Sequence, residues 1–422
     1  MNIEKLLKGD DICACGMVHK CPIDHVIIKE NACDSLTELV AAYNNILLVA
    51  DKTTYRVGGG TITEKLGVHL ADTLVYQTED VLVPNEAAIE ELRSHVTDKT
   101  DLIIGIGSGV INDLCKHVSF TAGLPYYIVA TAPSMDGYAS KGAALILDGM
   151  KVTLNANVPK AIIADVNILK DAPIDMIRAG YGDIIGKYSC LNDWKLAHLV
   201  NGEYLCKSVM NATYDAVEET VKLAEGVAKR EPAAVQALME ALVAVGILMA
   251  YVGNSRPASG SEHHLSHYFE IVGIVRGEEY LPHGVDVCCS AIETAKLREK
   301  LLAIVDISEY TYKFDKATYE ANIRRIYGTL ADEVLALQNK LGWYDTDRVS
   351  IYRDKWQEIR KLLASAPSSA EMLRLTEQVG LSYEGFKALY GDKKIADAHL
   401  YAKDLKDRYT VLWMYYDLFG TK

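Results

Sequence analysis

The chain has 422 residues, 50% of them hydrophobic and 24% charged, which is typical of a folded globular protein with two or three domains and excludes a disordered chain. Asp and Glu number 57 against 44 Lys and Arg, and the resulting net charge of −13 argues against general binding to nucleic acid or to an anionic membrane. It does not exclude a small anionic substrate, which needs only a local positive pocket.

The N-terminal residues contain no apolar stretch followed by a small-residue cleavage site, so we expect no signal peptide. The nine cysteines then indicate thiols in a reducing cytoplasm. Cys13, Cys15, His19 and Cys21 suggest a zinc motif. Their spacing is not that of a standard structural site and no later motif is seen to complete it, so structural zinc is not favoured.

Short β-rich runs alternate with helical patterns over the first 170 residues or so, which predicts parallel βαβ units. The expected strands are 25–29, 46–51, 73–77, 102–105, 126–131 and 161–166. The expected helices are 35–43, 61–71, 85–96 and 110–120. Asp148-Gly149 lies between two apolar runs and predicts a tight hairpin turn.

Helical periodicity dominates after about residue 172, as in the stretches 212–230, 233–251, 285–304, 316–341 and 356–363. The stretch 233–252 contains Gln236 and Glu240 and predicts a buried helix rather than a membrane span. We therefore expect a Rossmann-like α/β domain at 1–172 and an all-α domain at 173–422.

A glycine-rich turn joins an expected strand to an expected helix in residues 101–116. Gly105, Gly107 and Gly109 would let the backbone approach a pyrophosphate, with the N–H groups of the helix start facing the anion. Val110 stands where the third glycine of the dinucleotide fingerprint belongs. A tight βα turn without a ligand is the alternative.

Asp51 ends an expected strand, which is a suitable place to accept hydrogen bonds from an adenosine ribose. The alternative is a cap for the turn at Thr53 and Thr54, and the sequence does not decide between the two.

Three histidines fall within residues 263–267, and His263 and His267 share a helix face at a spacing of four. His283 follows just before another expected helix. A divalent metal usually takes a carboxylate as a third ligand, and Asp183, in an apolar and small-residue stretch, is the best candidate. A helix cap at Asp183 and a polar face for the histidines are the alternatives.

Six motifs occur in the order 107–113, 131–140, 182–185, 193–194, 259–263 and 283–284. Together they resemble the glycerol-1-phosphate dehydrogenases, in the superfamily of iron-containing alcohol dehydrogenases, glycerol dehydrogenases and dehydroquinate synthases. Ser-Gly-Ser-Glu-His and Thr-Ala-Pro-Ser-x-Asp-Gly are the specific elements. The resemblance spans roughly residues 10 to 300, and the tail beyond about 310 matches no motif.

The resemblance implies an active site in a cleft between the two domains. It implies metal ligation by Asp183, His263 and His283, and substrate contact by Asp136 and His267, with Asp183 near the substrate. The resemblance also implies a set of cofactor contacts, namely Gly107, Ser108, Gly109, Val110, Ile111, Asn112, Asp113, Thr131, Ala132, Pro133, Ser134 and Ser140. Asp51 is added to this set mainly because of its position at the end of a strand.

The implied reaction is the NAD(P)H-linked interconversion of dihydroxyacetone phosphate and sn-glycerol 1-phosphate, a step of phospholipid biosynthesis. Nickel or zinc is implied as the metal, with iron less favoured. Asp51 would repel a 2′-phosphate, which favours NADH over NADPH. The cation for the substrate phosphate is not identified, and Lys141, Lys187 and Arg256 are the candidates.

Three alternatives stay open: a dehydrogenase for glycerol or another small polyol, a dehydroquinate-synthase-like lyase, and a non-catalytic metal- or nucleotide-binding protein. The 25 tyrosines suit half-buried interfaces and favour a homodimer or a larger homo-oligomer. We expect a cytoplasmic enzyme without a nucleic-acid partner.

Overall fold

The computed structural model describes residues 2–9, 12–78, 81–147 and 150–420. It divides the chain into two compact units, each made of two stretches of sequence. Unit 1 is residues 1–184 with 218–253, and unit 2 is 185–217 with 254–422. The sequence predicts instead two consecutive domains that meet at residues 172 and 173. Residues 218–253 group with unit 1 because their long helix packs against elements of that unit.

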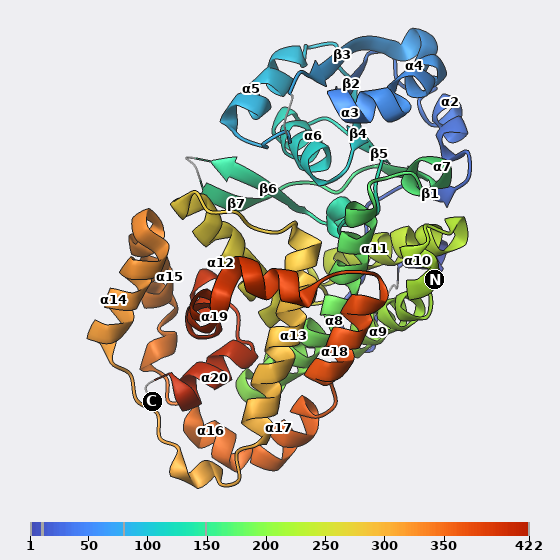
Figure 1. The fold of residues 1–422 in the computed structure, drawn as a ribbon. Helices are drawn as coiled ribbons and strands as arrows, with labels where there is room; N and C mark the ends of the chain where they lie inside the picture. Colours follow the sequence, from blue (N-terminus) through green and yellow to red (C-terminus); the bar gives the residue numbers. More distant parts are fainter. Residues whose placement is uncertain (1, 10–11, 79–80, 148–149, 421–422) are drawn as a thin grey trace. The chain divides into compact units, whose positions relative to one another are not determined.

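A parallel sheet forms the core of unit 1 (Figure 1). Within the described residues it has six strands in the order β1-β8-β5-β4-β2-β3, and every pairing is parallel. Strands β2, β4, β5 and β8 are buried almost along their whole length, as apolar strands covered on both faces are. Their bounds are β1 (His25–Lys29), β2 (Ile46–Asp51), β3 (Leu70–Tyr76), β4 (Leu102–Gly107), β5 (Tyr126–Ala130) and β8 (Ala161–Asp165).

The predicted strands are thus confirmed, with shifts of one to three residues at some ends. The antiparallel strands β6 (Gly142–Leu147) and β7 (Met150–Asn155) form a separate pair. The predicted turn at Asp148-Gly149 between them lies outside the described residues.

The helices of unit 1 agree with the predictions for α5, α6 and α11, and the helices predicted at 35–43 and 61–71 are shorter in the structure. The stretch 35–43 contains only a 3-10 turn and one helical turn. The elements are α1 (Ile3–Lys8), η1 (Ala32–Ser35), α2 (Leu36–Leu39), α3 (Lys52–Thr54), the π-helix η2 (Tyr55–Gly59), α4 (Gly60–Leu66), η3 (Gly67–His69), α5 (Glu86–His95), α6 (Gly109–Ala122), η4 (Gly137–Ala139), α7 (Val166–Leu169), α10 (Ala224–Ala228) and α11 (Pro232–Val252).

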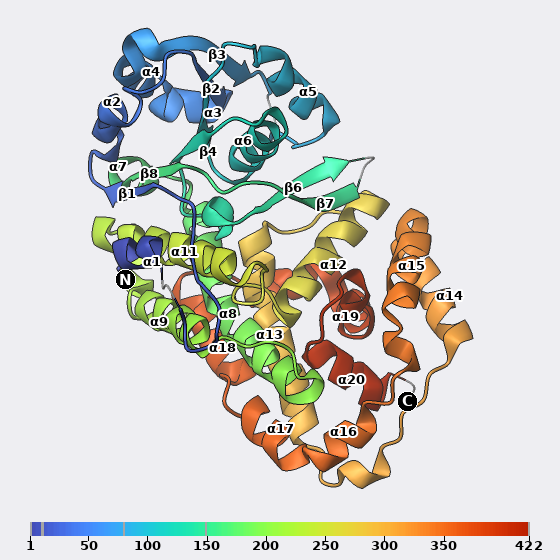
Figure 2. The ribbon, with the colours of Figure 1, turned by 180° about the vertical axis from the view of Figure 1, so that it is seen from behind.

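Helix α11 is the one helix among the described residues that is long and apolar enough to cross a membrane. Most of its apolar window, 78%, is buried inside the protein, as in the core helix of a globular domain. It packs against α1, α7, β1 and η4, and Figure 2 shows it beside α1. The prediction of a buried helix at 233–252 is confirmed.

Two helices run across the division between the units without a break: α8 (Ile174–Asn201) and α9 (Lys207–Lys222). The sequence pattern does not predict α8 as a helix. Its low amphipathic contrast explains this, because α8 is buried on most sides and has no polar face that alternates with an apolar one.

The described part of unit 2 consists of helices joined by loops and contains no strand, and α13 runs through its middle (Figure 1). Helix α13 contacts α12, α17, α18, α19 and α20. The predicted helix 316–341 is broken at Gly328 into two. The elements are α12 (Ser261–Arg276), α13 (His283–Leu302), η5 (Ile307–Glu309), α14 (Lys316–Tyr327), η6 (Gly328–Leu330), α15 (Ala331–Leu341), η7 (Trp343–Asp345), α16 (Val349–Asp354), α17 (Trp356–Leu363), α18 (Ser369–Gln378), α19 (Tyr383–Tyr401), η8 (Ala402–Leu405) and α20 (Val411–Phe419).

Candidate active site

The glycine-rich turn lies at the carboxyl end of β4 and leads straight into α6. A Cβ on Gly107 would stand 2.6 Å from the Cβ of Ile111, so this glycine is needed for close packing of the helix on the strand. A Cβ on Gly109 would meet nothing nearer than the Cε atom of Met135 at 3.7 Å. Packing therefore does not require glycine at position 109, where α6 and its first backbone N–H groups begin.

The sheet order brings three predicted cofactor positions to one edge. Asp51, Gly107 and Thr131 stand at or just past the carboxyl ends of β2, β4 and β5, which are neighbours in the sheet. Ala50 pairs with Ile106, and Gly107 pairs with Ala130, so the three ends are level. In open parallel sheets this edge is where ligands bind.

Asp51 also has the capping role that the sequence left open. Its Oδ1 atom accepts hydrogen bonds from the backbone N–H groups of Thr53 and Thr54, each at 2.8 Å. With the Thr54 hydroxyl this forms a capping box for the short helix α3. Within the described residues no hydrogen bond reaches Asp51 Oδ2.

Asp113 and Ser140, both predicted cofactor contacts, surround a buried lysine that the sequence motifs do not single out. The Nζ atom of Lys116 lies 3.2 Å from Asp113 Oδ1 and 3.4 Å from Ser140 Oγ. It also donates to the carbonyl oxygens of Gly137 at 2.9 Å and Gly142 at 2.8 Å. The lysine thus fixes the 137–142 backbone on α6. Its position, one helical turn after Asp113, was the available signal.

The segment 131–136 is held against the start of α8. A Cβ on Gly180 would stand 1.8 Å from the carbonyl oxygen of Pro133, so α8 approaches this segment as closely as only glycine allows. One helical turn later, Oδ2 of the buried Asp183 accepts a hydrogen bond of 3.0 Å from the backbone N–H of Asp136. The structure therefore brings Asp136 and Asp183 together.

Three imidazole rings form a triangle in unit 2. His263 and His267 lie one turn apart on α12, and His283 is the first residue of α13. The ring centroids are 6.0 Å apart for His263 and His267, 5.1 Å for His263 and His283, and 5.5 Å for His267 and His283. His264 is buried elsewhere, and burial lowers the pKa of its ring well below the usual value, so it is neutral.

Glu262, which the sequence motifs gave no separate role, orients His263. Its Oε1 atom lies 2.7 Å from His263 Nδ1 and also accepts a hydrogen bond of 2.9 Å from the N–H of Gly260. Burial is the main reason that the pKa of Glu262 rises to about 7. A hydrogen bond at Nδ1 leaves Nε2 of His263 as the ligand atom, as in many carboxylate–histidine–metal arrangements.

Asp193 fixes the beginning of α12. Its Oδ2 atom accepts from the N–H of Ser261 and its Oδ1 atom accepts from the N–H of Val411, both at 2.7 Å. Burial and the neighbouring Glu262 raise the pKa of Asp193 to about 6. One carboxylate thus ties the helix of His263 and His267 to the C-terminal tail.

Asp183, His263 and His283 each offer one ligand atom, and these three atoms all lie within 4.8 Å of one another. The set of one carboxylate oxygen and two imidazole nitrogens suits Zn²⁺, Ni²⁺ or Fe²⁺ and leaves coordination positions open for a substrate. His267 is not part of this group, although its ring adjoins those of His263 and His283.

The three candidates for the substrate phosphate differ in their surroundings. The guanidinium of Arg256 is engaged by both carboxylate oxygens of Glu203 and by the carbonyl oxygen of Tyr409, so it serves structure. Lys187 is fully buried on α8. Its positive charge lowers the pKa of Glu262 and partly offsets the effect of burial on that carboxyl. Lys141 is exposed.

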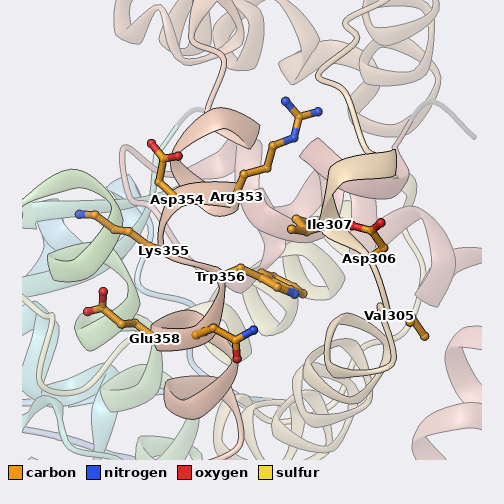
Figure 3. A pocket seen from close by; sticks show the side chains of 9 residues that line it. Val305, Asp306, Ile307, Arg353, Asp354, Lys355, Trp356 and Glu358 are labelled. Atoms are coloured by element: carbon orange, nitrogen blue, oxygen red, sulfur yellow. The ribbon is translucent and has the colours of Figure 1, made fainter.

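A surface hollow in unit 2 is lined by residues 305–307 and 353–358, which include no predicted site residue. Figure 3 shows the charged side chains of Asp306, Arg353, Asp354 and Lys355 pointing in different directions. They do not converge on a common point, so this hollow offers no built ligand site.

Known proteins resemble this chain over most of its length. A family model described as iron-containing alcohol dehydrogenase matches residues 27–173. The glycerol-1-phosphate dehydrogenase [NAD(P)+] of Bacillus licheniformis is 32% identical over 78% of this chain and 86% of its own. The chain belongs to the glycerol-1-phosphate dehydrogenase family.

Other members of the glycerol-1-phosphate dehydrogenase family extend the match in both length and lineage. The Halalkalibacterium halodurans enzyme is 29% identical over 95% of this chain and 94% of its own, so the likeness includes the tail beyond residue 310. The Archaeoglobus fulgidus enzyme is 30% identical over 75% of this chain and 89% of its own.

Solved structures share the fold of this family member. A putative alcohol dehydrogenase from Ralstonia eutropha superposes with a TM-score of 0.59 at 14% identity, covering 94% of this chain and 96% of its own. A probable glycerol dehydrogenase from Sinorhizobium meliloti gives 0.53 at 19% identity, covering 87% and 98%. The predicted fold class, a parallel α/β region followed by a mostly helical one, is confirmed.

Proposed function

We propose that this chain is a metal-dependent oxidoreductase that interconverts dihydroxyacetone phosphate and sn-glycerol 1-phosphate with NAD(H) or NADP(H). The observation that carries the proposal is the grouping of Asp183, His263 and His283, with His267 beside them, in a member of the glycerol-1-phosphate dehydrogenase family. The level strand ends at Asp51, Gly107 and Thr131 support a dinucleotide site in the same chain.

The residues have distinct tasks in this proposal. Asp183, His263 and His283 hold the ion, with Glu262 keeping Nδ1 of His263 occupied so that Nε2 faces inward. When bound, the ion supplies Lewis-acid polarisation at the C2 oxygen, and the nicotinamide supplies or takes the hydride at C2.

In this proposal His267 holds or releases the proton that accompanies the change at the C2 oxygen. Its ring lies 5.5 Å from that of His283, so it adjoins the ligands without joining them. Asp136 would contact the substrate from the segment that its backbone N–H anchors on Asp183. The N–H groups at the start of α6 would receive the cofactor pyrophosphate.

A substrate panel tests the proposal. Purified protein is incubated with NADH or NADPH, with added nickel or zinc, and with dihydroxyacetone phosphate or dihydroxyacetone. Oxidation of the reduced cofactor with the phosphorylated substrate and not with dihydroxyacetone is the expected result. Chiral analysis of the product should give sn-glycerol 1-phosphate.

The other outcomes separate the alternatives. Turnover with dihydroxyacetone alone would indicate a polyol dehydrogenase. Product formation from a dehydroquinate-synthase substrate without net change in NADH would indicate a lyase. Binding of metal and cofactor with no turnover at all would indicate a non-catalytic protein.

The finer features of this proposal are nickel or zinc as the metal, a role in phospholipid biosynthesis, a cytoplasmic location and a homo-oligomeric state. All nine cysteines lie among the described residues, and none of them is joined in a disulfide. Gel filtration with light scattering tests the oligomeric state.

A further inference from the structure

A second group of ligand-type side chains shares no residue with the group of Asp183, His263 and His283. Cys13, Cys15, His19 and Cys206 each offer one ligand atom, and all four atoms lie within 4.8 Å of one another. Cys13, His19 and Cys206 are buried and Cys15 is half-buried. Cys206 lies in the link between α8 and α9, nearly two hundred positions after Cys15 along the chain. It supplies the completing ligand that the N-terminal spacing alone lacks.

The N-terminal three ligands are preformed by a tight turn. The N–H of Cys13 donates to the carbonyl oxygen of Met17 at 2.9 Å, and the N–H of Gly16 donates to that of Cys13 at 2.8 Å. Gly16 has a φ of 84°, a conformation that favours glycine. This turn brings the Sγ atom of Cys15 to 3.3 Å from Nε2 of His19.

The ring of His19 is fixed from its other side. Its Nδ1 atom lies 3.2 Å from the carbonyl oxygen of Tyr251, and the ring stacks on that of Tyr251 at 5.2 Å with an interplanar angle of 11°. A carbonyl oxygen can only accept, so Nδ1 carries the proton and Nε2 presents its lone pair toward Cys15. Histidines that bind metals characteristically have this second hydrogen bond.

We propose that Cys13, Cys15, His19 and Cys206 bind a structural zinc ion, separate from the ion held by Asp183, His263 and His283. Three thiolates and one imidazole form a complete tetrahedral set with no open position, which is the mark of a structural zinc site. Zn–S bonds of about 2.3 Å and a Zn–N bond of about 2.0 Å in a tetrahedron place S and N about 3.5 Å apart. The observed 3.3 Å is close to that value. Binding releases the thiol protons as the three Zn–S bonds form.

The site would anchor residues 13–19 to the α8–α9 link. Helix α1, which precedes them, contacts α11 but has no buried residue. Cys21 is a matched control, because it is a buried cysteine of the same segment and is not in the group.

Elemental analysis of the full-length protein tests the proposal. We compare wild type with Cys206→Ser, Cys21→Ser and His263→Ala after dialysis against a mild chelator. The His263→Ala variant should lose the ion of the first site and keep one equivalent of zinc, and Cys21→Ser should match wild type. Cys206→Ser should lose the thiolate-bound equivalent. Cys206→His retains a ligand atom and should keep that zinc, which separates loss of a ligand from loss of fold.

Two measurements on the unmutated chain complete the design. A mercurial reagent that titrates thiols should release zinc in step with three thiols, and cobalt-substituted protein should show thiolate-to-cobalt charge-transfer absorption. Absence of both, or a metal-free His263→Ala protein, would overturn the proposal. A disulfide among Cys13, Cys15 and Cys206 in a non-reducing peptide map of protein purified from a reducing cytoplasm would overturn it as well.

Discussion

Glu262 contacts His263, the first of two neighbouring histidines on α12. The carboxylate lies 2.7 Å from Nδ1 of His263 and therefore fixes which nitrogen of that ring faces the other ligands. His264, the next residue, is turned into the interior, where burial keeps it neutral. The surroundings of the two imidazoles thus differ, although the residues are adjacent in the chain.

The proposed metal ligands form the first test at this scale. His263→Ala or His283→Ala should strip the metal and leave the fold largely intact, because each removes one donor from a set of three. Asp183→Asn should weaken metal binding and reduce turnover by orders of magnitude, since a neutral amide replaces the charged ligand. Metal content by elemental analysis and secondary structure by circular dichroism measure both effects.

His198→Ala is the control, because His198 is an exposed histidine on α8 outside the group. It should keep the wild-type metal content. A full complement of this metal in the His263 and His283 variants would show that the ligands are misassigned.

His267 should behave differently from His263, although both lie on one face of α12. His267→Ala should keep near-normal metal content and NADH affinity and lose about 10²–10⁴-fold in rate, the usual contribution of a general acid or base. Metal stoichiometry and steady-state rates of both variants are measured side by side. If the His267 variant loses the metal and the His263 variant keeps it, the two roles are reversed.

Short elements at the carboxyl edge of the sheet combine structural and binding roles. Asp51 ends β2 and caps α3 through a single carboxylate oxygen, Oδ1. The sequence offered the cap and the ribose contact as alternatives. The structure shows the cap, and the ribose contact stays a prediction that the same side chain can satisfy with Oδ2.

Two substitutions of Asp51 separate these roles. Asp51→Ala should lower stability by about 0.5–2 kcal/mol through loss of the cap and should reduce the preference for NADH. Asp51→Asn keeps a capping oxygen but removes the charge that would repel a 2′-phosphate. It should therefore shift cofactor preference with little effect on the melting temperature. The ratio of kcat/KM for NADH and NADPH is the measurement, and an unchanged ratio in both variants would refute the ribose assignment.

At the scale of the whole molecule, the tail after residue 310 supports the histidine-bearing helices of unit 2. Val411 at the start of α20 donates to Asp193, which also accepts from the first residue of α12. Arg408 donates to the carbonyl oxygen of Ser259 at 2.7 Å, just before that helix. The tail without a recognisable motif is thus part of the framework that positions His263 and His267.

Acid stability should depend on a contact between α13 and α19. Burial raises the pKa of Glu293, but hydrogen bonds with His399, Tyr383 and Lys296 outweigh it and lower the pKa from 4.5 to about 2. His399 Nε2 and Lys296 Nζ lie 2.9 Å and 3.0 Å from the carboxylate. A depressed pKa in the folded state stabilises the protein above about pH 4.5, and this contribution is lost as the pH falls toward 2.

Glu293→Gln should remove this pH-dependent part of the free energy of unfolding. The part amounts to about 3 kcal/mol near neutral pH, because each pKa unit of the shift corresponds to about 1.4 kcal/mol. Denaturant unfolding of the wild type and variant from about pH 7 to about pH 3 measures it, and the two curves should converge as the pH falls. Glu358→Gln, at an exposed position on α17, is the control and should run parallel to wild type. If the free energies of unfolding of Glu293→Gln and wild type differed by the same amount at every pH, the prediction would be contradicted.

The amino-acid sequence by itself determined the parallel sheet, the glycine turn before α6 and the family resemblance. These depend on short-range patterns: apolar runs of strand length, glycines at fixed spacing and motifs within a few residues of each other. Helix α8 could not be predicted in this way, because a helix buried on most sides has no periodic contrast between polar and apolar residues.

Only the tertiary structure decided which distant residues meet. Asp193 joins Ser261 and Val411, Lys116 holds Gly137 and Gly142, and Cys206 joins a group with Cys13, Cys15 and His19. None of these pairings is encoded in local spacing, because each partner is fixed by helices and strands that pack from far-apart parts of the chain. The sequence therefore specifies the elements and the kinds of ligand available, whereas packing decides which of those ligands share a site.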